Sequence, residues 1–246
     1  MDLREKKNNC KWVQTDPACR REAFEKAKAL VLPPGGTVEE DSTIDYYYTE
    51  QVDEHAVLLL GLGRNVRGSM QYILNELNAN DAFRDFRIYV RTIKDTDGIV
   101  REFIRNNGWN RTQTILDEKE YRRLLESVKY LITESFFPTV WIKKDEQVCI
   151  NIWHGTPLKK LGLAKNSDNH HTSGTVQKNF IEADYLLYPN DYTRDHMLAS
   201  YKVRELMNGR TLMLGYPRCG GMLTAAASDL SALRERLSPH GERLYA

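Results

Sequence analysis

The stretch 151–162, NIWHGTPLKKLG, places a histidine between a strand-like run and residues that favour the start of a helix. Gly155, directly after His154, allows the backbone to turn tightly and to approach a ligand closely. Thr156 is a good N-cap residue, and Pro157 is favoured as the first residue of a helix. The pattern predicts a strand, then His154, then a short helix.

A helix that begins at Thr156 would direct free N–H groups and a positive dipole end into the same crevice as His154. Such a helix end binds anions, and Lys159 and Lys160 would lie close to it. Gly162 suits the end of the helix. An imidazole with a reference pKa of about 6.5 beside a phosphate pocket suits a general base, an effect worth roughly 10²–10⁴ in rate. A histidine that only stabilises a turn fits the local pattern equally well, so both interpretations stay open here.

Arg218, in the GYPR block at 215–218, follows another strand-like run and would project into the same crevice, where it could clamp a phosphate. A surface arginine after a turn is the alternative. The glycine loop at 61–65, GLGRN, lacks the third glycine of a dinucleotide fingerprint because Val66 stands in its place. The loop is therefore weak support for a nucleotide site and remains a possible glycine-rich loop beneath an acceptor.

The adjacent histidines His170 and His171 are the obvious metal candidates, but neighbouring histidines rarely both reach one ion, and no spaced cysteine or carboxylate set accompanies them. We expect them to lie in a solvated loop. The sequence shows no evident cofactor site and predicts no metal site.

Short apolar runs alternate with helical patterns of about ten residues from residue 56 onward, which favours βαβ units and a mostly parallel sheet. In such sheets, binding sites lie beyond the carboxyl ends of the strands. Strands are expected at 56–62, 87–92, 112–116, 130–133, 148–153, 185–189 and 211–215, and helices at 20–32, 69–78, 98–106, 118–127, 174–182 and 191–201.

The composition is that of a globular protein: 246 residues, 41% hydrophobic and 28% charged, with a net charge of +1 that indicates neither a nucleic-acid partner nor an anionic membrane. Four widely spaced cysteines fit a reducing compartment. The first residues do not form a secretory signal, and the longest apolar run, 56–60, is too short to span a bilayer. We expect a cytoplasmic protein, or one held peripherally on the inner face of the membrane.

Four blocks together resemble the CDP-glycerol glycerophosphotransferase family: YLITESF at 130–136, WHGTPLKKLG at 153–162, ADYLLYPNDYTRDHM at 183–197 and GYPR at 215–218. The resemblance covers roughly residues 56–223. It implies an α/β fold with a Rossmann-like, mostly parallel sheet flanked by helices, as the N-terminal half of a GT-B-like architecture. It also implies transfer of glycerol phosphate from CDP-glycerol to a hydroxyl of a lipid-linked acceptor in teichoic acid synthesis, with release of CMP.

The family's motif histidine, its proposed base, corresponds to His154. Five further residues are expected, from their placement, to bind phosphate: Gly155, Thr156, Lys159, Lys160 and Arg218. Cys219 and Gly220 follow GYPR where the family usually has Asn-Asp, which leaves the role of that pair open.

The expected division is an irregular leader at 1–50, the acceptor-side domain at 51–240 and the start of a missing nucleotide-binding half at 241–246. A chain without that half would have little activity alone. A non-catalytic domain that binds a phosphate polymer or a partner, and a ribitol-phosphate transferase, are the alternatives.

Overall fold

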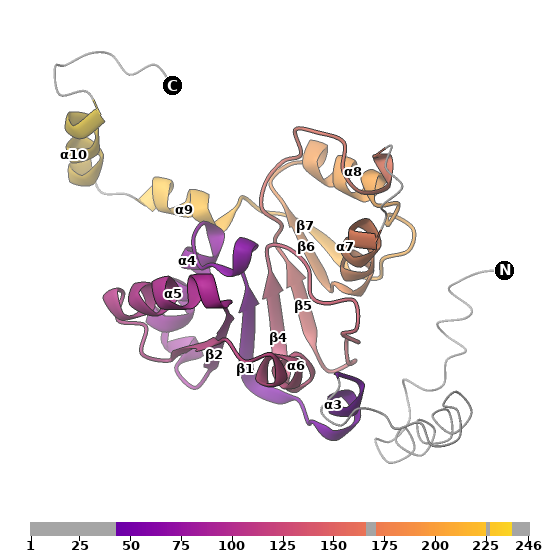
Figure 1. The fold of residues 1–246 in the computed structure, drawn as a ribbon. Helices are drawn as coiled ribbons and strands as arrows, with labels where there is room; N and C mark the ends of the chain where they lie inside the picture. The colour runs from indigo at the N-terminus through magenta and orange to yellow at the C-terminus, as the bar shows by residue number, and fades with distance from the viewer. Residues whose placement is uncertain (1–42, 166–170, 225–226, 238–246) are drawn as a thin grey trace, which may run out of the picture.

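The computed structural model describes residues 43–165, 171–224 and 227–237, and its centre is a sheet of seven parallel strands (Figure 1). The strands are β1 (Asp53–Leu60), β2 (Arg87–Arg91), β3 (Thr112–Ile115), β4 (Val128–Thr133), β5 (Val148–Asn151), β6 (Tyr185–Tyr188) and β7 (Arg210–Met213). All seven predicted strands are confirmed, with boundaries moved by a few residues. Residues 56–60 of β1 are continuously apolar, and they are buried between helices on both faces of the sheet.

Helices cover the two faces of the sheet. α4 (Ser69–Ala79) and α5 (Lys94–Asn106) pack on one face, while α6 (Glu118–Ser127), α7 (His171–Glu182) and α8 (Asp191–Ser200) pack on the other (Figure 1). Alternate residues of β1 divide between the faces: Val57 and Leu59 contact the α4 side, and Leu58 and Leu60 the α6 side. The predicted α/β class, with a Rossmann-like sheet, is therefore confirmed.

The strand order is β3-β2-β1-β4-β5-β6-β7. Successive strands are added on one side of β1 up to β3 and on its other side from β4 onward, so the topological switch point lies between β1 and β4. In the register, Leu60 lies opposite Thr133, which in turn lies opposite Asn151. The loops that follow β1, β4 and β5 are therefore neighbours at the carboxyl edge. In open α/β sheets, the topological switch point is where ligands bind.

Three further helices complete the described chain: α3 (Thr43–Thr49), α9 (Pro217–Thr224) and α10 (Ala227–Leu237), with α9 against α4. The expectation of an irregular leader through residue 50 is wrong for 43–49, because α3 packs against α6 and buries Tyr46. The helix expected at 20–32 and the segment 241–246 lie outside the described residues. Within the described ranges, no helix combines the length and the apolar composition needed to cross a membrane.

Candidate functional site

His154 lies just beyond β5 at the carboxyl edge of the sheet, half-buried and stacked on Trp153 with ring centroids 4.2 Å apart. Its Nδ1 lies 2.7 Å from the backbone carbonyl oxygen of Glu134. A carbonyl oxygen can only accept, so Nδ1 carries the proton and the Nε2 of the neutral ring keeps its lone pair. The imidazole is therefore held as the tautomer that can accept a proton at Nε2.

The turn that presents His154 is strained and buried. Trp153 has φ of 51°, in the left-handed region that bulky residues rarely adopt, yet its side chain is only 6% exposed. The indole contacts Phe180 and Tyr201 in the core, and the backbone N–H donates to the Asn151 side chain at 3.0 Å. Packing thus holds a conformation that the local sequence would not choose, a pattern that clusters at functional sites.

The helix predicted from Thr156 is absent, which corrects the proposed anion site at its N-terminus. Residues 156–161 form an irregular loop, and the Thr156 hydroxyl is 2.8 Å from that of Thr193 on α8 instead of capping a helix. Lys159 and Lys160 are exposed on this loop, beside a Leu158 that is 99% exposed. Propensity for a helix start was outweighed here by a tertiary hydrogen bond to α8.

Gly162 does not end a helix as expected but opens the 3₁₀ turn η4 (Gly162–Ala164). Its φ is +54°, and a Cβ at this position would lie 2.6 Å from the carbonyl oxygen of Ser200. Only glycine allows this close approach of the loop to the end of α8.

Arg218, at the start of α9, reaches the predicted site. Its guanidinium donates to the backbone carbonyl of His154 at 3.3 Å and lies over the ring of Tyr216 at 4.5 Å. Burial raises the pKa of the Tyr216 phenol. The structure therefore brings together His154, Gly155 and Arg218 at one corner. Arg218 has five donors, so these contacts leave others for a phosphate.

Glu134 is a residue of this corner that the sequence analysis did not single out. Its carboxylate accepts from the N–H groups of Leu62 and Ser69, both at 3.2 Å, and the residue is 3% exposed. Burial raises the pKa of this carboxyl, against the opposing effects of those N–H groups and of Arg218. Glu134 directly follows the strand predicted at 130–133, at the carboxyl edge of the sheet, where binding sites form. That position is the sequence signal that could have identified it.

The glycine loop after β1 is part of the same arrangement and offers no open nucleotide cradle. It forms the 3₁₀ turn η2 (Leu62–Arg64), and a Cβ on Gly61 would lie 1.8 Å from the carbonyl oxygen of Asn65. The loop expected at the histidine pair is wrong for His171, which is the first residue of α7, whereas His170 lies outside the described residues. Among the described residues, no group of three or more His, Cys, Asp or Glu side chains is placed to hold a metal ion.

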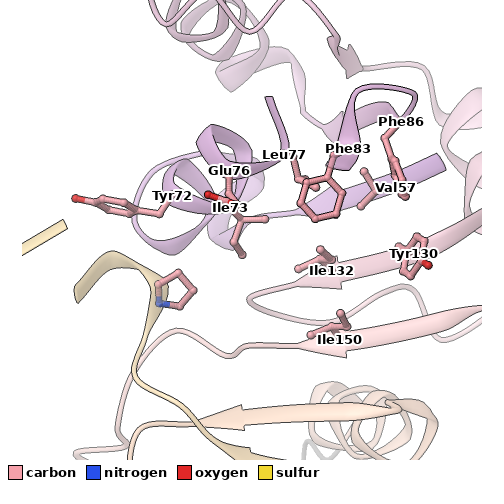
Figure 2. Close-up of a pocket in the computed structure, with 11 residues that line it drawn as sticks. Val57, Tyr72, Ile73, Glu76, Leu77, Phe83, Phe86, Tyr130, Ile132 and Ile150 are labelled. Carbon is pink, nitrogen blue, oxygen red and sulfur yellow. The ribbon is translucent and has the colours of Figure 1, made fainter. Parts of the chain in front are cut away.

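A cavity of about 490 Å³ lies between α4 and the sheet, on the opposite face from α7 and α8 (Figure 2). Figure 2 shows Ile73 of α4 above Ile132 and Ile150 of the strands, and the lining is almost entirely apolar. Pro217 also lines it, directly before Arg218. His154 and Arg218 do not line the cavity, so the candidate site is the polar corner and not this cavity.

The fold and this corner define a class: a Rossmann-like α/β domain that presents a histidine at the carboxyl edge of a parallel sheet. Residues 44–245 match the family model described as CDP-Glycerol:Poly(glycerophosphate) glycerophosphotransferase. The chain belongs to that family, as its sequence motifs predicted.

Curated relatives and solved structures agree with this assignment. The chain is 33% identical over 103 residues to a teichoic acid poly(glycerol phosphate) polymerase of Bacillus spizizenii, across 38% of this chain and 24% of the relative. A polymerase of the same description from Staphylococcus epidermidis is 31% identical over 124 residues, across 47% of this chain and 16% of the relative.

The fold is similar to that of the wall teichoic acid polymerase TagF, with a TM-score of 0.62 at 19% identity over 91% of this chain and 53% of that chain. A TagF variant soaked with CDPG gives the same TM-score over 88% of this chain and 54% of that chain. The chain thus spans about half of TagF and a quarter or less of these two curated relatives, and this likeness supports the GT-B-like fold.

Proposed function

We propose that this chain supplies the acceptor-side half of a CDP-glycerol glycerophosphotransferase, which extends or primes a glycerol-phosphate polymer on a lipid-linked acceptor. The observation that carries the proposal is the 2.7 Å contact between Nδ1 of His154 and the Glu134 carbonyl, which leaves Nε2 free to take a proton. Family membership supplies the reaction class.

In the proposed reaction, the acceptor hydroxyl gives its proton to Nε2 of His154 as its oxygen attacks the β-phosphorus of CDP-glycerol. The bond from that phosphorus to the bridging oxygen breaks, and CMP leaves with the electron pair. Arg218, whose guanidinium donates to the carbonyl of His154, would bind a phosphate of the donor or acceptor. Lys159 and Lys160, exposed on a loop beside the site, would contribute positive charge for the polyanionic acceptor. We expect action on the cytoplasmic side, with peripheral attachment to the membrane.

Binding by the chain itself is the first test. A synthetic glycerol-phosphate oligomer is titrated into ¹⁵N-labelled protein, and the amide resonances of Gly155 and Arg218 are expected to shift in a saturable manner. Arg218→Gln should weaken that binding, and Arg105→Gln, an exposed position on α5, should leave it unchanged. Equal weakening by both variants would indicate non-specific charge attraction and would count against a site at this corner.

Transfer is tested by CMP release from CDP-glycerol, with the chain alone and with the nucleotide-binding half of a family member added in cis or as a separate chain. We expect little activity alone and measurable activity with the added half. His154→Ala in the active pair is expected to lower the rate by roughly 10²–10⁴. An unchanged rate in His154→Ala would show that His154 is not the base. Binding without transfer in any combination would favour the non-catalytic alternative.

A further inference from the structure

We propose that Glu134 is a positioning residue that holds His154 as the Nδ1-protonated tautomer, by fastening the loops after β1 and β4 to the loop that carries His154. The inference rests on the proposed role of His154 as the base. Glu134 itself acts through the imidazole.

The side chain of Glu134 ties its loop to the start of α4. One carboxylate oxygen accepts from Leu62 in the glycine loop, and the other accepts from Ser69, the first residue of α4. The N-cap residue of this helix is Gly68, which has no side chain to cap it, so the Glu134 carboxylate takes that role from 65 positions away in sequence.

The carboxylate also fills the place where this fold usually binds phosphate. A glycine loop followed by a helix N-terminus at the topological switch point is a ready-made anion site. Here that site is occupied by an internal anion, which the N–H groups and the helix dipole stabilise.

The backbone of Glu134 then transmits this placement to His154. Its N–H donates to the carbonyl oxygen of Leu60 at 3.2 Å, and its own carbonyl accepts from Nδ1 of His154. The preceding Thr133 is tied on both sides, since its hydroxyl donates to Leu60 and its carbonyl accepts from the N–H of Ile152. With side chain and backbone both fixed, the carbonyl has one direction available, and that direction faces the imidazole.

Arg218 connects the two ends of this arrangement. Its charge lowers the pKa of the Glu134 carboxyl, and its guanidinium donates to the carbonyl of His154. The buried carboxylate is therefore compensated by the backbone N–H groups of Leu62, Ser69 and Met70, and by one cation that also holds the histidine turn. Loss of the carboxylate is expected to loosen both the turn at Glu134 and the turn at His154.

The test is ¹⁵N NMR of histidine-labelled protein at pH 8.5, where a histidine of ordinary pKa is neutral. In the wild-type protein, we expect Nδ1 of His154 to be protonated and Nε2 to be unprotonated. In Glu134→Gln, the amide nitrogen cannot accept, so at least one of the N–H groups at this carboxylate loses its acceptor. The tautomer ratio is then expected to fall by about five- to tenfold, the effect of weakening one hydrogen bond. Glu134→Asp keeps the charge but is one methylene shorter, and it should give a smaller fall.

The control is Ile104→Val on α5, a buried position on the opposite face of the sheet, where loss of a methyl group lowers stability modestly. It should leave the His154 tautomer unchanged, which separates positioning from general destabilisation. A wild-type protein with Nε2 protonated would overturn the proposal without any variant. So would a folded Glu134→Gln or Glu134→Asp protein that keeps the wild-type tautomer ratio. A wild-type protein with Nε2 protonated would also count against His154 as the base. An unchanged tautomer ratio in a folded Glu134 variant would overturn only the positioning role, and the proposed function would still be tested by CMP release.

Discussion

Glu126, near the end of α6, is expected to destabilise the folded protein at neutral pH. The residue is fully buried, and its carboxyl oxygens accept no side-chain hydrogen bond from the described residues. Burial raises its pKa from 4.5 to about 8, although the charges of Lys144 and Lys178 act in the opposite direction. The folded protein therefore keeps this proton at pH 7, whereas the unfolded chain releases it.

The cost follows from the two pKa values. Because the pKa of Glu126 is raised in the folded state, its titration does not change the free energy of unfolding below pH 4.5 and lowers it progressively between pH 4.5 and about 8. The free energy of unfolding falls by about 1.4 kcal/mol for each pH unit above the unfolded-state pKa of 4.5. At pH 7 this loss amounts to about 3 kcal/mol. Glu126→Gln has nearly the same shape and no titration. Its free energy of unfolding should exceed that of the wild type by about 1–3 kcal/mol at pH 7, and the gain should vanish near pH 4.5.

Urea unfolding followed by circular dichroism at several values between pH 4.5 and 9 measures this difference. The matched control is Glu102→Gln on α5, an exposed glutamate whose substitution should change stability by less than about 0.5 kcal/mol at every pH. A Glu126→Gln advantage that stays constant across the pH range would refute the argument, because only the titration of Glu126 makes the difference depend on pH.

Two shorter predictions concern the site. Gly162→Ala is expected to destabilise the protein by about 2 kcal/mol or more, because the added Cβ would meet the Ser200 carbonyl at a backbone with φ of +54°; an unchanged midpoint of thermal unfolding would show that the loop moves away freely. Arg218→Gln removes the positive charge that lowers the pKa of Glu134, so that pKa should rise further in a ¹³C carboxyl NMR titration. An unchanged titration midpoint would mean that Arg218 does not compensate this carboxylate.

The sequence by itself determined where the strands lie, that βαβ units would make the sheet mostly parallel, and that His154 would follow a strand. Short runs such as 56–60 are buried on both faces, so their apolar pattern alone identifies them as strands of a parallel sheet. Placement of His154 just after β5 then follows from chain order. The WHGTPLKKLG block identified the family, which the match over residues 44–245 confirms.

Only the tertiary structure decided what surrounds that histidine. Thr156 and Pro157 favour a helix by local preference, yet the hydroxyl of Thr156 pairs with Thr193, which is 37 residues away. Glu134 contacts Leu62 across 72 residues and His154 across 20. Local propensities are worth less than about 1 kcal/mol per residue, so contacts between distant segments readily outweigh them. The sequence therefore located the candidate base, His154, and the packing of three neighbouring strand ends set its hydrogen-bond partner.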